Sequence, residues 1–246
     1  DGAVSFMTHA AAGTPPRVID VLEGLGSSFV TLTRDPSDGR FFAPSGSLNA
    51  LSRVGLRLDA NSVTVENAQL YTASPLFFSG LNTGSLVNAR QVIVDPRATA
   101  PYAGRLYTIA ASPEALLVGR AGTESNFVVE EVIDLGSQPT RAELIEIGGR
   151  YVIAVSCYTS RDLYFIDADL LRVIAVIRGF SGAFEIAFDE PRERLYVSDY
   201  RVSVLRFVDL APLFDCVLDR VPPSPTRSCS PRLLGMMGIP NAVQQL

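Results

Sequence analysis

The feature that most constrains the fold is a short repeated motif, an arginine followed by apolar or aromatic residues. It occurs as RFFAPSG from Arg40, RLYTIAA from Arg105, RYVIAVS from Arg150 and RLYVSDY from Arg194. The last three copies start 45 and 44 positions apart, whereas 65 positions separate the first two. A period of this length is typical of supersecondary units that repeat along a chain. The sequence therefore predicts a repeat architecture with extra residues in the long interval.

Short segments of alternating apolar and polar residues surround each copy, as expected for β-strands. The clearest unit is predicted to hold four strands, at Leu144–Ile147, Tyr151–Ser156, Leu163–Ile166 and Arg172–Ile177. We therefore predict an all-β fold, a β-propeller of roughly five to seven four-stranded antiparallel blades, because ring closure protects strand edges that an open array would expose. The ring is expected to be closed by the C-terminal strand or by a partner.

The repeat also suggests how the chain is divided. Residues 1–246 are predicted to form a single β-propeller domain, in which residues 58–88 are an insertion or a degenerate blade. Residues 215–232 are predicted to be a loop rich in proline and containing two cysteines. In the last repeat, Phe184, Ile186 and Phe188 alternate on the first strand, and Val202–Val208 forms the third.

Three repeats carry an aspartate, followed within two positions by proline, between the first and second strands: Asp35, Asp95 and Asp189. An aspartate side chain can accept a hydrogen bond from the backbone of the turn that it starts, and proline presets the φ angle of that turn. We interpret these residues as parts of turns.

Candidate catalytic groups are few. The single histidine, His9, argues against a Ser–His–Asp triad, and Ser45, Ser74 and Ser198 have no visible base. A calcium-dependent hydrolase would need carboxylates that converge on the channel of the propeller. The candidates for that role are Asp167, Asp169, Asp189, Glu190, Asp199 and Asp209. No catalytic residue or metal ligand is assigned from the sequence.

A cluster of aromatic residues lies in the long interval between repeats. The segment YTASPLFFSGLNTGS, with Tyr71, Leu76, Phe77 and Phe78, is a candidate interaction loop. The alternative is that Phe77 and Phe78 are strand residues of a degenerate blade.

The three cysteines indicate in which cellular compartment the protein is found. Cys216 and Cys229 flank a proline-rich segment and are predicted to form a disulfide that restrains it, with two free thiols as the alternative. Cys157 ends an apolar run and is expected in the core. A disulfide would indicate an oxidising compartment.

The net charge argues against nucleic acid as a partner, and the hydropathy argues against a membrane-spanning helix. The net charge of -5 offers no attraction to the phosphates of nucleic acid. No apolar stretch approaches the roughly 18 residues that a membrane-spanning helix needs.

The segments RLYVSDYRVSVLRFVDL and RYVIAVSCYTSRDLYFIDAD resemble the YVTN-type β-propeller repeats, and PPRVIDVLEG at the N-terminus resembles the last part of that repeat. The resemblance covers about two thirds of the chain. It implies a periplasmic, outer-membrane-associated or extracellular protein, and it transfers no catalytic residue. We therefore predict a non-catalytic protein-binding or scaffold propeller in an exported or surface assembly, with a protein partner and no cofactor. The alternative is a calcium-dependent hydrolase of the lactonase or phosphotriesterase kind.

Overall fold

The structure is a computed structural model that describes residues 4–7, 18–22, 31–37, 39–45, 49–54, 56–59, 62–65, 75–81, 86–122, 125–218 and 229–238. The chain divides into two compact units. The first comprises Asp1–Pro113 and Leu117–Val132, and the second comprises Glu114–Leu116 and Ile133–Leu246.

The first unit is built mainly on a sheet of eight strands ordered β3-β4-β5-β8-β12-β11-β10-β9. The strands are β3 (Thr33–Arg34), β4 (Phe41–Ser45), β5 (Ala50–Val54), β8 (Pro75–Ser79), β9 (Ala89–Val94), β10 (Arg105–Ala111), β11 (Glu114–Ala121) and β12 (Asn126–Asp134). Strand β8 pairs antiparallel with β5 and parallel with β12. Two hairpins stand apart from this sheet: β1 (Val4–Met7) with β2 (Val18–Leu22), and β6 (Leu56–Asp59) with β7 (Ser62–Val65).

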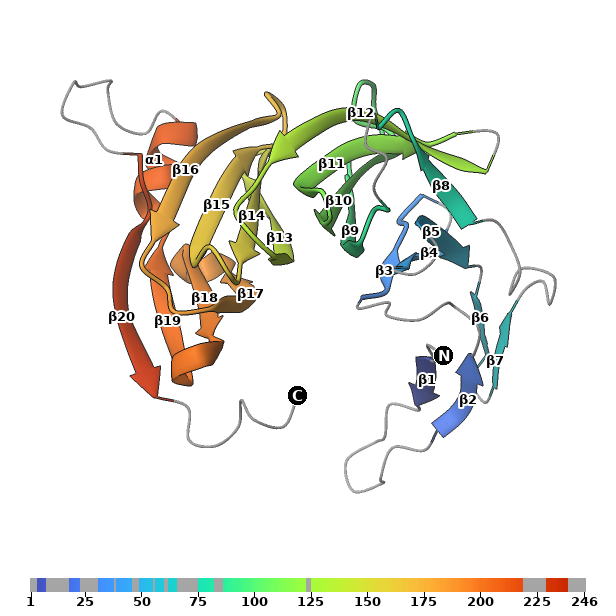
Figure 1. Cartoon of the computed structure of the whole chain (residues 1–246), viewed down its shortest axis with the longest axis horizontal. Helices are drawn as coiled ribbons and strands as arrows, with labels where there is room; N and C mark the ends of the chain where they lie inside the picture. Colours follow the sequence, from blue (N-terminus) through green and yellow to red (C-terminus); the bar gives the residue numbers. More distant parts are fainter. Residues whose placement is uncertain are drawn as a thin grey trace. The chain divides into compact units, whose positions relative to one another are not determined.

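The second unit contains two four-stranded antiparallel sheets, which Figure 1 shows in yellow-green to red. One holds β13 (Pro139–Ile147), β14 (Arg150–Cys157), β15 (Asp162–Asp167) and β16 (Arg172–Arg178). The other holds β17 (Ala183–Asp189), β18 (Arg194–Asp199), β19 (Val204–Asp209) and β20 (Arg232–Gly238). In both sheets the strands pair in the order in which they follow along the chain, as in the predicted blade.

The four strands predicted for the clearest repeat all lie within β13–β16, so this part of the prediction is confirmed. The third strand of the last repeat begins at Val204 rather than at Val202. Tyr200–Val202 forms a 3-10 turn that ends at Ser203 with a φ of 52°, and this turn delays the strand.

The predicted loop at 215–232 also differs from the structure. Its first residues belong to the helix α1 (Ala211–Val217), and its last is Arg232, where β20 begins. Proline at the start of α1 is compatible with a helix because the N–H that it lacks would have no partner in the first turn. The apolar residues Leu213 and Phe214 are buried and fix α1 to the sheets.

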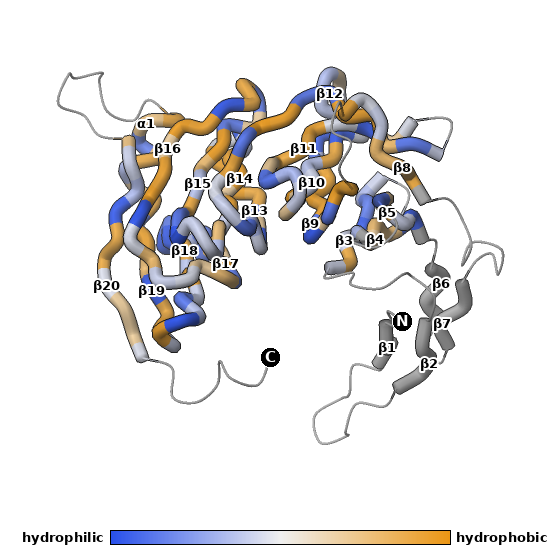
Figure 2. The backbone as a smooth tube through the Cα atoms, viewed as in Figure 1, coloured by the Kyte–Doolittle hydropathy of each residue, from blue (hydrophilic) through white to orange (hydrophobic). Residues whose placement is uncertain are grey.

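The core of the second unit lies between its two sheets. Ile145 and Ile147 of β13 and Phe165 of β15 belong to one cluster with Leu195 and Val208 of the neighbouring sheet. Figure 2 shows the apolar character concentrated along strands such as β11 and β14. Apolar residues in strands that are covered on both faces account for the continuous apolar runs in the sequence.

Candidate functional site

The aspartates at the repeated turns are held by nearby donors. Asp95 Oδ2 accepts a hydrogen bond from the Tyr107 hydroxyl at 2.8 Å, and Arg97 donates from Nε at 2.9 Å and Nη2 at 2.8 Å. Asp189 Oδ2 accepts from the Tyr196 hydroxyl at 3.0 Å in the same manner. The recurring RLY tripeptide of the second strand supplies the tyrosine each time.

Asp35 accepts a hydrogen bond from the backbone N–H of Ser37 at 2.9 Å, and Asp95 from that of Arg97 at 3.0 Å. These are the bonds expected of turn residues. The interpretation of these aspartates as structural is therefore confirmed.

Three further candidate carboxylates, those of Asp167, Asp199 and Asp209, have donors of their own. Asp167 accepts from the backbone N–H groups of Asp169 and Leu170, each at 2.9 Å. Asp199 is wholly buried and accepts from two backbone N–H groups and from Arg206, and Asp209 accepts from Ala211 N at 3.1 Å. Within the described ranges, no three His, Cys, Asp or Glu side chains are grouped so as to hold a metal ion. Asp167, Asp199 and Asp209 therefore hold turns and strand ends in the described structure.

A different set of side chains comes together where the first strands of the two sheets, β13 and β17, face each other. Arg141 Nε lies 2.9 Å from Glu185 Oε1, and Arg141 Nη1 donates to Thr140 O at 2.9 Å. The guanidinium carbon of Arg141 also lies 5.5 Å from the centroid of the Phe184 ring. A guanidinium has five N–H donors, so Arg141 can still donate to the oxygen of a bound molecule.

Glu143 lies two residues from Arg141 on β13, in a part of the strand whose register is regular. Alternate residues of a strand share a face, so Glu143 is on the face of Arg141 and of the buried Ile145. Among the described residues, Glu143 has no hydrogen-bond or ion-pair partner. Burial raises the pKa of its carboxyl group. A partly buried carboxylate without a partner is a candidate general base.

Three aromatic side chains pack together beside Arg141. The ring centroids of Phe184 and Tyr200 lie 5.7 Å apart, and each lies 6.2 Å from that of Tyr158. Gly182 makes this packing possible, since a Cβ atom there would lie 2.8 Å from Cε2 of Tyr158. Tyr200 is 39% exposed and presents an apolar ring with a polar hydroxyl to a ligand.

Sequence reasoning missed this set, although a signal was present in RAELIEI. Arg141 and Glu143 stand in phase with Ile145 and Ile147, which are buried. A charged residue in phase with the buried face of a strand is unusual and marks a position worth testing.

The predicted interaction loop is in part a strand. Leu76, Phe77 and Phe78 lie in β8, while Tyr71 lies outside the described residues. Leu76 is buried and Phe78 packs against Phe127 at a centroid distance of 5.3 Å, whereas Phe77 is 50% exposed. A role of this segment in binding a partner stays a prediction.

The other candidates are placed as follows. Ser45 ends β4, and Ser198 on β18 accepts a hydrogen bond from Glu185 N at 2.8 Å. Ser74 and His9 lie outside the described residues.

The predicted disulfide between Cys216 and Cys229 is present, with 5.6 Å between the Cα atoms. Cys157 is buried and unpaired, as expected. Disulfides persist in oxidising compartments, so this one fits a location outside the cytoplasm. No helix within the described ranges is both long enough and apolar enough to cross a membrane.

The chain is similar to known proteins in its structure but not detectably in its sequence. No protein family and no curated protein matches the sequence. The YVTN-type assignment therefore stays a prediction.

Three solved structures show the similarity. A candidate 6-phosphogluconolactonase from Bacteroides fragilis matches with a TM-score of 0.63 at 10% identity, over 96% of this chain and 64% of that one. The periplasmic gluconolactonase of Pseudomonas aeruginosa matches with a TM-score of 0.61 at 14% identity, over 97% of this chain and 64% of that one. The WD40 domain of Toxoplasma gondii coronin matches with a TM-score of 0.52 at 12% identity, over 84% of this chain and 48% of that one.

These matches bear on the fold and on the predicted function. The predicted fold class is confirmed, because the four-stranded antiparallel sheets and these neighbours define an all-β propeller. The chain spans 64% of the length of both lactonase-like neighbours. The prediction of a non-catalytic scaffold is wrong: several of the solved structures that share the fold are lactonase-like proteins, which favour the hydrolase alternative. The scaffold prediction relied on the lack of recognisable catalytic residues, whereas the partial burial of a carboxyl group such as that of Glu143 becomes evident only in the folded chain.

Proposed function

We propose that the chain is part of a propeller enzyme that hydrolyses a sugar lactone, with Glu143 as the general base and Arg141 as the group that polarises the carbonyl. The observation that carries the proposal is the carboxylate of Glu143, which is partly buried, has no partner among the residues that the structure describes, and lies on the same strand face as the guanidinium of Arg141. Support comes from the lactonase-like proteins that share the fold.

Hydrolysis of a lactone needs a base for water and a cation for the carbonyl oxygen. Glu143 would take a proton from water as the water oxygen attacks the carbonyl carbon. Arg141 would donate hydrogen bonds to the oxygen atom, on which negative charge develops. When the ring C–O bond breaks, the leaving oxygen takes the proton back from Glu143, and the product is the open hydroxy acid.

The surroundings suit a sugar lactone. Phe184 and Tyr200 provide apolar ring surface beside Arg141, and the Tyr200 hydroxyl is available to the hydroxyl groups of a sugar. The raised pKa of Glu143 makes its carboxylate a stronger base than an ordinary glutamate.

The test is hydrolysis of glucono-1,5-lactone and its 6-phosphate by the whole chain, followed by acid release in a pH-stat and corrected for the spontaneous reaction. Glu143→Gln is expected to lower kcat by about 10²–10⁴-fold. Arg141→Gln is expected to lower it by about 10²–10³-fold. Glu146→Gln is the matched control, because Glu146 is exposed and lies on the opposite face of the same strand.

The pH profile gives a second test. Glu143 acts as a base only when it is ionised, so kcat/KM should rise with pH through its raised pKa, and this rise should be lost in Glu143→Gln. A chain that hydrolyses neither lactone above the spontaneous rate, or a Glu143→Gln variant with full activity, would refute the proposal. Loss of activity with EDTA and its recovery with Ca²⁺ would instead support the calcium-dependent form of the hydrolase alternative.

The compartment and the repeat type are parts of the same proposal. The disulfide and the periplasmic gluconolactonase with the same fold support a periplasmic or extracellular location, which cell fractionation would test. The resemblance of the repeats supports a place among the YVTN-type propellers. Association with a protein partner or an outer-membrane assembly stays a prediction that co-purification can test.

A further inference from the structure

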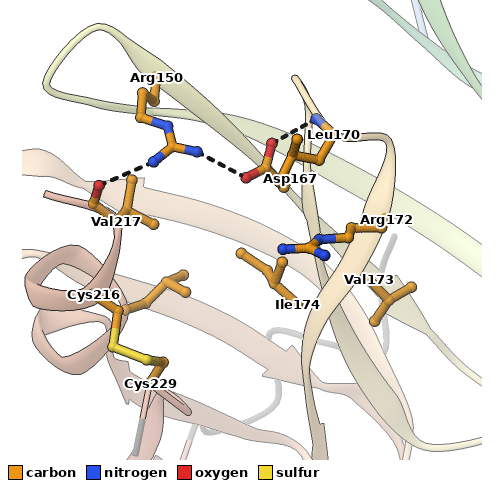
Figure 3. A pocket seen from close by; sticks show the side chains of 10 residues that line it. Arg150, Asp167, Leu170, Arg172, Val173, Ile174, Cys216, Val217 and Cys229 are labelled. Atoms are coloured by element: carbon orange, nitrogen blue, oxygen red, sulfur yellow. Dashed lines mark hydrogen bonds and ion pairs between the residues drawn. A yellow bond between two sulfur atoms is a disulfide. The ribbon is translucent and has the colours of Figure 1, made fainter. Parts of the chain in front are cut away.

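A pocket of about 450 Å³ lies in the second unit, away from the Glu143 site, where α1 faces the turn between β15 and β16. Figure 3 shows the pocket between α1 with its disulfide and the start of β16. A volume of this order is typical of sites for small molecules, which are usually largely preformed. The proposed lactone chemistry does not use the residues that line this pocket.

Three contacts fix the α1 side of the pocket. The disulfide joins Cys216 of α1 to Cys229, and both residues line the pocket. Arg150 Nη1 donates a hydrogen bond to Val217 O at 3.2 Å, near the end of α1. Gly148, with a φ of +57°, lets the β13–β14 turn approach Leu218 so closely that a Cβ atom would collide with its side chain. The wall is therefore held by covalent, polar and packing contacts.

Positive side chains outnumber negative ones in the lining of the pocket. Arg150 Nη2 lies 3.3 Å from Asp167 Oδ2, and Arg150 Nε lies 4.0 Å from Oδ2 of Asp169 beside the pocket, so the charge of Arg150 is compensated. Arg172 has no hydrogen-bond or ion-pair partner among the described residues. With two arginines and one aspartate, the lining carries a net charge of +1. Figure 3 shows the Arg172 side chain extending from β16 toward the middle of the pocket.

The remaining surface is apolar and in part exposed. Val173 is 37% exposed and Leu170 is 54% exposed, and Ile174 and Val217 also line the pocket. Exposed apolar side chains beside an unpaired guanidinium match a ligand that has an anionic head and an apolar body. The fork of N–H groups on a guanidinium fits a carboxylate in a bidentate manner.

We propose that this pocket binds a small monocarboxylate with an apolar body, whose carboxylate pairs with Arg172 and whose body lies against Val173, Ile174 and Val217. The net charge of +1 balances one negative charge. A phosphate monoester would place about two negative charges beside Asp167, so it is expected to bind more weakly.

The experiment is calorimetric titration of the whole chain with 4-phenylbutanoate, 4-phenylbutan-1-ol and 4-phenylbutyl phosphate. The three probes share one apolar body and differ in the head group. The carboxylate is expected to bind most tightly, and Arg172→Gln is expected to weaken it by about tenfold or more. Arg178→Gln is the matched control, because Arg178 is exposed on the same strand and does not line the pocket.

Tryptophan fluorescence shows whether the carboxylate binds at this pocket. The chain contains no tryptophan, so Val173→Trp would place a single indole at the pocket wall, and Leu86→Trp would place one at an exposed position in the first unit. The carboxylate is expected to change the fluorescence of the first variant and not of the second. The proposal would be overturned if the alcohol bound as tightly as the carboxylate, or if the phosphate bound more tightly. It would also be overturned if Arg172→Gln left the affinity for the carboxylate unchanged, or if the carboxylate did not change the fluorescence of Val173→Trp.

Discussion

Replacing Asp199 by alanine is the sharpest test of how the second unit is held together. The Asp199 carboxylate is wholly buried at the end of β18. It accepts hydrogen bonds from Ser181 N at 2.9 Å, from Gly182 N at 2.7 Å and from Arg206 Nε at 2.6 Å. The carboxylate therefore joins the β16–β17 connection to β18 and β19.

The expected loss of stability follows from what the substitution leaves behind. Removal of one partner of a buried ion pair costs about 3–5 kcal/mol, because the other charge stays buried without compensation. The Arg206 side chain is only 15% exposed, so it meets this condition. Each backbone N–H that loses its acceptor would cost about 1–3 kcal/mol by itself. These costs overlap, and we expect about 4 kcal/mol in total, or a fall in Tm of about 8–16 °C.

The assay is urea unfolding monitored by circular dichroism, with Asp189→Ala as the control. Asp189 also pairs with an arginine, but the Arg192 side chain is 64% exposed. Exposed ion pairs contribute little, so the control should lose much less stability. Equal losses in the two variants, or a loss below about 1 kcal/mol for Asp199→Ala, would refute the reasoning.

Three further predictions concern single groups. The double variant Cys216→Ser/Cys229→Ser should lose about 3 kcal/mol in urea unfolding, as expected for a disulfide that closes a loop with a sequence separation of 13; unchanged stability would contradict this. Burial raises the pKa of the Cys157 thiol to about 12, so a thiol-specific reagent at pH 8 should label no cysteine in the folded chain and one in denaturant without reductant; rapid labelling of the folded chain would count against burial. Burial tends to raise the pKa of Asp95, but hydrogen bonds from Arg97 and Tyr107 outweigh this effect and lower it below its ordinary value of 3.8. Asp95 therefore contributes stability at neutral pH that is lost as the pH falls below about 3.8, and Asp95→Asn should show less loss than the unmodified chain in acid unfolding.

The regular parts of the fold could be predicted because their signals are local. The apolar segments at Tyr151–Ser156 and Arg172–Ile177 predicted β14 and β16, and the aspartate–proline turns predicted where the first strand of a repeat ends. The helix α1 was missed because its proline, Cys216 and short length are typical of a loop. Its helical form depends on Leu213 and Phe214 packing against the sheets, which is a tertiary contact.

The candidate site was missed for a similar reason. The carboxylates that stand out in the sequence, such as Asp167 and Asp199, are those that bind backbone N–H groups and arginines in the folded chain. The phase of Glu143 with Ile145 and Ile147 in RAELIEI was a weak signal, and only the folded strands show that its carboxyl group is partly buried and has no partner among the described residues.

The sequence by itself determined the all-β class, the period of the repeat, the turns and the disulfide, because each depends on residues close together along the chain or on a strand's own alternation. The tertiary structure alone decided which charged groups are neutralised and which are left unpaired. That outcome depends on residues far apart in the sequence: Arg141 pairs with Glu185 of the neighbouring sheet, while Glu143 and Arg172 have no partner within the part of the chain that the structure describes. Hydrogen bonds and ion pairs form over a few ångströms, so the reactivity of a side chain is set by the neighbours that folding brings to it.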